Sequence, residues 1–210
     1  MGEDRVPVGI RKILDWDVRA TKNAVDWAFT KYPSSTSSNA KAYMKILEIS
    51  CHGIPWFAIT MISIYLIPSA REFQVNLLMG LILDVILVAL TKAISRRNRP
   101  SVSNDMFFTH GPDKFSFPSG HASRSVLLLL FLTHTIIDSM IILPILYLWV
   151  VAVCISRVLL RRHHLLDVAF GVIYGVIEFY ILWILLWASQ STSRTIGNWI
   201  AGAEDEFDGS

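Results

Sequence analysis

Three short clusters of basic, histidine and acidic residues stand at the ends of apolar stretches in this chain. The first runs from Lys92 to Pro100 and includes Arg99, the second is Pro118-Ser119-Gly120-His121, and the third extends from Arg157 through His163 to Asp167. Binding a phosphate group takes several positive charges and directed N–H donors, and an arginine fork can hold two phosphate oxygens at once. These residue types therefore indicate phosphate recognition.

The candidate cations of such a site are Lys92, Arg99 and Arg157. Ser119 and Gly120 fall at a predicted helix start, where unpaired backbone N–H groups favour an anion and glycine allows close approach. An N-cap followed by a turn explains the same two residues without any ligand. For this pair, the residues alone leave both interpretations open.

Two histidines and one aspartate could carry out the reaction itself. His163 and Asp167 are four residues apart, so on a helix they share a face and the carboxylate can hold one imidazole nitrogen as N–H. The other nitrogen is then unprotonated and nucleophilic. His121, from a different helix end, could protonate a leaving oxygen, while His164 is a weaker alternative nucleophile. Together these groups predict phosphoryl transfer through a phosphohistidine without a metal, because the basic side chains balance the charge.

Long apolar stretches are the elements that must position these clusters. Five of them, at residues 49–68, 74–91, 122–137, 140–156 and 165–187, are candidate membrane spans, each span needing roughly 20 residues. Of the 210 residues, 53% are hydrophobic and only 17% are charged, which is typical of a membrane protein. We therefore predict an all-α, integral membrane helical bundle with about five transmembrane helices and all three clusters on one side of the membrane.

The N-terminal region has a different pattern. Apolar side chains recur at intervals of three and four at Ile13, Trp16, Ala20, Ala24 and Trp27. This spacing predicts an amphipathic helix over residues 10–29 that lies in the membrane interface, although a helix packed on the protein would suit the same pattern. A Ser-rich stretch at residues 33–39 predicts a flexible link. We expect an N-terminal region at 1–47, a membrane-embedded domain at 48–187 and a polar tail at 188–210.

Charge distribution limits the topology and the class of protein. Of the nineteen Lys and Arg residues, all but Arg71 and Arg194 fall on the side of the clusters, which by the positive-inside rule predicts that this side faces the cytosol.

A formal net charge of +2 argues against a nucleic-acid partner. Cys51 and Cys154 lie in apolar stretches without metal-ligand spacing, so neither zinc nor a disulfide scaffold is expected.

Two carboxylates fall inside the predicted spans. Asp84 lies in the second span and Glu178 in the fifth. Because a carboxylate inside a bilayer is costly, these side chains should face protein or water. We expect each of them to pair with a basic side chain of the bundle, although a proton path is an alternative.

The spacings Lys92-x6-Arg99-Pro100, Pro118-Ser119-Gly120-His121 and Ser156-Arg157-x5-His163-x3-Asp167 resemble the three-part signature of the type 2 phosphatidic acid phosphatase superfamily. The resemblance covers residues 92–167, with compatible helices to residue 187. It implies an all-helical fold, with His163 as nucleophile, Asp167 as its support and His121 as proton donor. It also implies that phosphate is held by Lys92, Arg99, Ser119, Gly120 and Arg157. Lipid phosphatases of this family commonly have six membrane helices, so the N-terminal amphipathic stretch could stand in for the first.

The short chain, its basic N-terminal region and the Arg96-Arg97 pair look similar to the polyisoprenoid diphosphate phosphatase branch of that family. This likeness implies substrates such as presqualene or farnesyl diphosphate or phosphatidic acid, and a location in the endoplasmic reticulum and nuclear envelope. Arg96, Arg97, Arg161 and Arg162 could reach a second phosphate or merely contact lipid headgroups.

Three other classes of protein share part of this pattern. A catalytically silent scaffold of the same fold would not need His121, His163 and Asp167. A vanadate-dependent haloperoxidase would have a similar anion cage, but such enzymes are soluble, and an anion channel would place its charges along a pore. We therefore expect an enzyme that acts on a lipid phosphate in a membrane and needs no cofactor, while the oligomeric state is not indicated.

Overall fold

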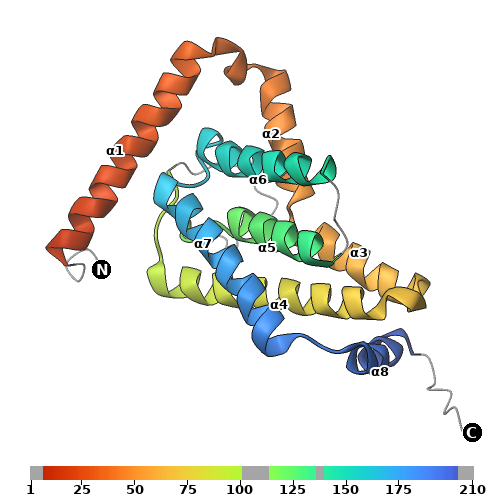
Figure 1. The fold of residues 1–210 in the computed structure, drawn as a ribbon. Helices are drawn as coiled ribbons and strands as arrows, with labels where there is room; N and C mark the ends of the chain where they lie inside the picture. The colour runs from red at the N-terminus through yellow and green to blue at the C-terminus, as the bar shows by residue number, and fades with distance from the viewer. Residues whose placement is uncertain (1–6, 101–113, 136–139, 203–210) are drawn as a thin grey trace, which may run out of the picture.

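The computed structural model describes residues 7–100, 114–135 and 140–202, and these residues form a helical bundle with no strand among them (Figure 1). The main helices are α1 (Val8–Lys31), α2 (Ser38–Ser50), α3 (Gly53–Leu66), α4 (Arg71–Ser95), α5 (Gly120–Thr135), α6 (Ile142–Leu159), α7 (Leu165–Ile181) and α8 (Gln190–Ala201). Short helical turns lie at Pro33–Thr36, Pro68–Ala70 and Leu182–Leu186. The predicted all-α class is confirmed.

Helix α5 occupies the centre of the bundle. It packs against α4, α6 and α7, and Figure 1 shows it between α4 and α6 with α7 crossing in front. Nine of its sixteen residues are buried, so most of its surface faces protein rather than lipid. The core around it is aliphatic and aromatic, formed by Leu77, Leu81, Leu127, Leu128, Phe131, Phe179 and Leu182.

Two glycines allow α7 to lie directly against α5. A Cβ atom added at Gly171 would lie 2.6 Å from the carbonyl oxygen of Ser119, and one at Gly175 would lie 2.3 Å from that of Ser123. Any larger residue would force the backbones apart, as at other close helix contacts in membranes. The contact is continued at the helix starts, where the backbone N–H of Ser119 donates to the carbonyl of Asp167 over 2.9 Å.

Three helical stretches are long and apolar enough to span a membrane, at Pro68–Ser95, Ile142–Leu159 and Leu165–Leu186. Helices α2 and α3 would form a fourth candidate if counted as one span, bent by 45° at Cys51–His52. Each of the five predicted spans coincides with a helix, but the count of five crossings is not confirmed. The described part of α5 has sixteen residues, and α3 has fourteen.

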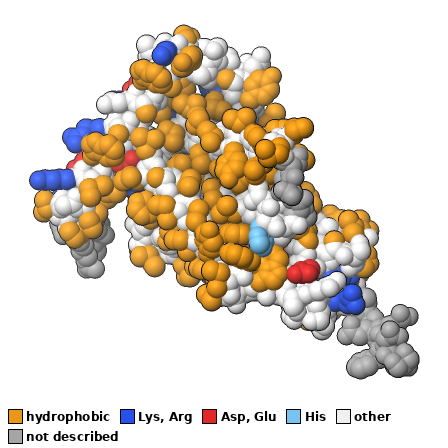
Figure 2. All heavy atoms as spheres, viewed as in Figure 1, with side chains coloured by type: hydrophobic (Ala, Val, Ile, Leu, Met, Phe, Trp, Pro, Cys, Tyr) orange, Lys and Arg blue, Asp and Glu red, His pale blue; other side chains and the backbone are white. Residues whose placement is uncertain are grey.

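The surface of the bundle fits a lipid environment. Figure 2 shows hydrophobic side chains over most of the visible face, with Lys and Arg at its margins. Large exposed hydrophobic residues occur along α3, α4, α6 and α7. The chain is therefore an integral membrane protein.

The N-terminal helix confirms the predicted helical pattern and shows which face packs on the protein. Helix α1 contacts α6 and α7 through a buried row of Asp17, Thr21 and Val25. The expected apolar stripe points elsewhere, since Trp16 and Trp27 are 57% and 58% exposed. The stripe is thus available to a membrane interface, while the mainly polar face binds the bundle.

The predicted flexible link is partly helical. Pro33–Thr36 forms a 3₁₀ turn, and the hydroxyl of Ser37 caps α2 by accepting a hydrogen bond from the N–H of Ala40 over 3.2 Å. Serine is a favoured N-cap because its side chain satisfies an otherwise unpaired N–H group. The Ser-rich composition therefore marks a helix start as well as a connection.

Candidate active site

The three clusters lie at one end of the bundle, where four helices begin or end. Lys92 is in the last turn of α4, Gly120 begins α5, Arg157 is in the last turn of α6 and Asp167 is in the first turn of α7. His163 lies in the short connection from α6 to α7. Clusters that are up to 75 residues apart in sequence therefore meet at a single site.

The imidazole of His163 is oriented by a backbone group. Its Nδ1 atom lies 2.7 Å from the carbonyl oxygen of Ser116. Because a carbonyl can only accept, this contact places the proton on Nδ1 and leaves a lone pair on Nε2. The expected partner, Asp167, approaches Nδ1 only to 3.9 Å. The prediction that Asp167 directly holds the N–H of His163 is therefore corrected, since the carbonyl of Ser116 takes that place.

Ser116 is held by the segment that follows α4. Its N–H donates to the carbonyl of Arg97 over 2.8 Å, and its hydroxyl donates to the carbonyl of Asn98 over 3.0 Å. The first cluster thus fixes the loop whose carbonyl orients the ring of His163 in the third. No pattern of residue types reveals such a contribution, because it is made by a main-chain oxygen.

Asp167 has three polar partners. Its Oδ1 atom pairs with Nη1 of Arg97 at 2.7 Å, and its Oδ2 accepts from the backbone N–H of His164 at 2.7 Å. The Nδ1 atom of His164 lies 3.2 Å from the same oxygen. Asp167 therefore closes the first turn of α7 and ties His164 to the helix start, which leaves His163 oriented toward Ser116.

Positive charge and burial keep His163 neutral. Burial is the main cause that lowers its pKa from 6.5 to about 3. The charges of Arg99, Lys92 and Arg157 act in the same direction, and Asp167 opposes them. At neutral pH the ring is therefore uncharged and its Nε2 lone pair is available. All three predicted cations therefore act electrostatically on His163.

Arg157 is 1% exposed and approaches a partner on α2 that sequence patterns did not indicate. Its Nη1 lies 3.4 Å from Oε1 of Glu48, and its Nε donates to the hydroxyl of Ser156 over 3.3 Å. The remaining nitrogen, Nη2, is buried and has no hydrogen-bond partner among the described residues. A buried guanidinium nitrogen of this kind is suited to a phosphate oxygen.

His121 lies in the first turn of α5, and His163 is one of the groups that influence it electrostatically. The Nε2 atom of His121 is buried without a hydrogen-bond partner in the described part of the chain. The bend between α2 and α3 adjoins it, because Sγ of Cys51 contacts the carbonyl of His121 at 3.2 Å and the rings of His52 and His121 are 6.0 Å apart.

The hydrogen bonds of Ser119 fit the N-cap, one of the two interpretations that the sequence left open. Its hydroxyl accepts from the N–H of Ala122 at 3.5 Å, as an N-cap does. Its own N–H is already used by the carbonyl of Asp167. Gly120 lies beside α4, where an added Cβ would be 3.3 Å from Val88. An anion at this helix start would therefore not receive the N–H of Ser119.

Arg97 is 12% exposed and binds two carboxylates. Besides Asp167, its Nη2 contacts Oδ2 of Asp17 at 2.6 Å. The suggestions that Arg97 reaches a second phosphate or a lipid headgroup do not fit this arrangement. Arg161, by contrast, forms an exposed pair with Asp26 at 2.9 Å.

The two intramembrane carboxylates lie inside the bundle. Asp84 pairs with Arg124, which confirms the expected pairing with a basic side chain. Glu178 instead accepts a hydrogen bond from the hydroxyl of Ser123 at 2.7 Å. Arg124 also donates to the carbonyl of Cys51 at 3.2 Å, so this group supports the bend next to His121.

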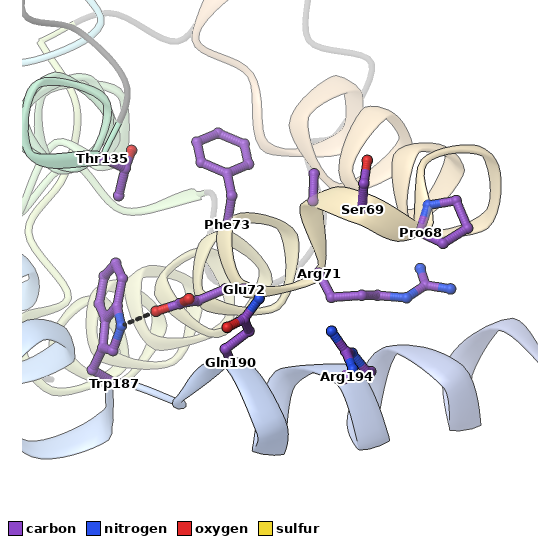
Figure 3. A pocket seen from close by; sticks show the side chains of 10 residues that line it. Pro68, Ser69, Arg71, Glu72, Phe73, Thr135, Trp187, Gln190 and Arg194 are labelled. Atoms are coloured by element: carbon purple, nitrogen blue, oxygen red, sulfur yellow. Dashed lines mark hydrogen bonds between the residues drawn. The ribbon is translucent and has the colours of Figure 1, made fainter. Parts of the chain in front are cut away.

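A cavity of about 400 Å³ lies at the other end of α4, beside α8 (Figure 3). Its lining includes Arg71, Glu72, Trp187 and Arg194, and Glu72 accepts a hydrogen bond from the indole of Trp187. None of the cluster residues lines it. This cavity is therefore separate from the candidate active site.

Among the described residues, no group of three or more His, Cys, Asp or Glu side chains is arranged to hold a metal ion.

Comparisons with known proteins show the family of the chain. A family model described as the PAP2 superfamily matches residues 73–191. A protein named "Probable lipid phosphate phosphatase beta" from Arabidopsis thaliana is 33% identical over 159 residues, which cover 63% of this chain and 74% of the relative.

Two crystal structures share the fold. Aquifex aeolicus LpxE has a TM-score of 0.57 at 20% identity and covers 74% of this chain and 92% of its own. The first transmembrane PAP2 type phosphatidylglycerolphosphate phosphatase from Bacillus subtilis has a TM-score of 0.59 at 21% identity. The match covers 81% of this chain and 84% of the Bacillus chain. At these identities the likeness shows a common fold.

Proposed function

The chain belongs to the PAP2 superfamily and is a hydrolase acting on phosphate esters, and from this premise we propose that it is a metal-independent lipid phosphate phosphatase whose nucleophile is His163. The observation that carries the proposal is the 2.7 Å contact between Nδ1 of His163 and the carbonyl of Ser116. It leaves a lone pair on Nε2, and the charges of Arg99, Lys92 and Arg157 act on the same ring, which supports their proposed role in holding the phosphate.

In the first step, Nε2 of His163 attacks phosphorus and the bond from phosphorus to the lipid oxygen breaks. Burial lowers the pKa of His121 below its ordinary 6.5, so the ring takes up its proton together with the anionic substrate. It then gives this proton to the leaving oxygen, so the lipid leaves as an alcohol, or as a monophosphate when the substrate is a diphosphate. The positive charge on the phosphorylated imidazole is partly balanced by the phosphate oxygens. Lys92, Arg99 and Arg157 neutralise the charge on those oxygens as the bond changes occur.

In the second step, water attacks the phosphohistidine. His121, now neutral, takes a proton from the water, the P–N bond breaks and inorganic phosphate forms. His163 returns to its starting state with the proton still on Nδ1, which donates a hydrogen bond to the carbonyl of Ser116. The predicted phosphate-binding groups Ser119 and Gly120 lie at the start of α5.

The substrate class that we propose is lipid phosphates of the isoprenoid diphosphate or phosphatidic acid type. The Arabidopsis relative is named for lipid phosphates, which supports this class. The site lies at one end of an apolar bundle, where a headgroup can reach it while the tail stays in the lipid. Arg97 is bound by two carboxylates, so a second phosphate would have to use other cations.

A panel assay in detergent with EDTA tests this function. Purified protein is given phosphatidic acid, sphingosine phosphate, farnesyl diphosphate and presqualene diphosphate, and released inorganic phosphate is measured. We expect release from at least one lipid in the presence of EDTA and none from the His163→Asn variant. Loss of turnover on chelation that magnesium restores would contradict the mechanism.

We also propose that the protein lies in the endoplasmic reticulum and nuclear envelope with its site facing the cytosol. The orientation is supported by the charges, because Arg71 and Arg194 lie at the α8 end, whereas the clusters and their basic residues lie at the opposite end. Glycosylation sequons tested in sealed microsomes give the orientation. A sequon near Asn104 should stay unmodified and one after Gly202 should be glycosylated, and the reverse pattern would show an inverted topology.

A further inference from the structure

Helix α1 lies outside residues 73–191, which match the family model, yet it takes part in the architecture of the active site. Its Asp17 is 0% exposed and Thr21 is buried beside it. A buried carboxylate on a helix whose opposite face is apolar needs compensating partners. Those partners are backbone and side-chain groups of the first and third clusters.

Asp17 and Thr21 cap α7 from a distance. Oδ1 of Asp17 accepts the N–H of Leu166 at 3.1 Å, and Oγ1 of Thr21 accepts the N–H of Leu165 at 3.0 Å. The first N–H groups of a helix have no partner within it, so an outside acceptor stabilises that end. Here the acceptors come from a helix more than 140 residues earlier in the chain.

The second contact of Asp17 leads to the catalytic aspartate. Arg97 joins the two carboxylates, with 2.6 Å to Asp17 and 2.7 Å to Asp167. If Asp17 is neutralised, Arg97 loses one of two anionic partners and is free to change its position relative to Asp167. The backbone of Arg97 also binds Ser116, whose carbonyl orients His163.

We propose that Asp17 is a positioning residue of the active site: through Arg97 and the start of α7 it fixes Asp167 and the ring of His163. This inference rests on the proposed role of His163 as nucleophile. Asp17 does not touch the phosphate. It sets the geometry of the groups that do.

The test compares two carboxylates on the same helix. Asp17→Asn keeps an oxygen for Leu166 but removes the charge that binds Arg97. Asp26→Asn is the matched control, because Asp26 forms the same kind of pair with Arg161 while being 49% exposed. Both variants are purified in detergent, and the phosphoenzyme burst gives the concentration of competent sites.

We expect Asp17→Asn to lower kcat per competent site by about tenfold or more with KM within about twofold of wild type, because small displacements of reacting groups slow chemistry more than binding. Asp26→Asn should match wild type. In combination with Arg97→Gln, the Asp17→Asn effect should be less than additive, since the two residues act as a unit.

Several results would overturn the inference. A purely structural role of Asp17 would reduce the number of competent sites and leave kcat per site unchanged. Equal kcat in Asp17→Asn and Asp26→Asn, or strictly additive effects with Arg97→Gln, would likewise count against it. Failure of the proposed function is recognised separately, because His163→Asn would then retain turnover whatever the Asp17 variants do.

Discussion

His163 and Asp167 approach each other to 3.9 Å at Nδ1 and Oδ2, and a backbone carbonyl of Ser116 lies closer to the ring than the carboxylate does. The imidazole therefore keeps its tautomer without the aspartate. The two residues should consequently respond differently to substitution, although they lie only four residues apart in the sequence.

Replacing His163 by Asn should abolish both turnover and any acid-quenched phosphoenzyme, because the attacking nitrogen is gone. Asp167→Asn should lower kcat by about 10- to 1000-fold yet still form phosphoenzyme, since the Ser116 carbonyl still holds Nδ1–H. Rapid-quench phosphoenzyme labelling measures both. Complete absence of labelling in a well-folded Asp167→Asn protein would refute this division of roles.

His121→Ala should slow the formation of the phosphoenzyme according to the leaving group. A lipid alcohol needs protonation as it leaves, whereas an activated aryl phosphate does not, so the loss should be much larger for the lipid. Single-turnover rates on the two substrates give the comparison. The general-acid role is wrong if both substrates lose activity equally.

Gly171→Ala should damage both stability and activity. The added Cβ would lie 2.6 Å from the carbonyl oxygen of Ser119, so α7 must move away from α5 at the point where two clusters meet. Overpacking of this kind costs about 1–3 kcal/mol. Thermal unfolding in detergent together with kcat measures the effect.

The control for this substitution is Gly9→Ala, because nothing lies within 4 Å of a Cβ at Gly9. It should leave kcat unchanged and should not lower Tm, since alanine is the better helix former. If Gly171→Ala behaves like Gly9→Ala, close packing of α7 on α5 does not set the site.

Stability should depend on pH through His163. Its pKa in the folded protein, about 3, lies below the ordinary 6.5. Below about pH 6.5, His163 binds a proton in the unfolded chain but not in the folded protein. The contribution of His163 to the free energy of unfolding is therefore fully present above this pH and is lost as the pH falls toward 3. For this one group the slope approaches about 1.4 kcal/mol per pH unit.

Thermal unfolding of wild type and His163→Asn at several pH values between about 7.5 and 4.5 isolates this contribution. The variant should lose Tm less steeply on acidification. Parallel decreases in the two proteins would show that the ring of His163 is not kept neutral by the fold.

Candidate catalytic side chains can be predicted from the sequence because their chemistry depends on residue type. Lys92, Arg99, Arg157 and His163 are predicted in this way, and in the structure the three cations act electrostatically on His163. The apolar stretches likewise predicted the positions of the bundle helices, although not how many of them cross the membrane.

Contacts made by main-chain atoms or by distant segments could not be predicted from residue patterns. Ser116 contributes a carbonyl oxygen, which every residue has. Asp17 is a carboxylate in the predicted interfacial helix, and Glu48 is one just before the first predicted span. Only the packing of α1 and α2 on the bundle brings them to Arg97 and Arg157.

The cap that Asp17 provides has a consequence for how the enzyme is made. Asp17 and Leu166 are separated by 149 residues, so at a synthesis rate of about 5–20 residues per second roughly 7–30 s pass between their emergence from the ribosome. Throughout that time the polar face of α1 has no α7 to bind. Helix α1 is thus translated long before it can dock, and a nascent chain acquires phosphatase activity only after α7 has been inserted.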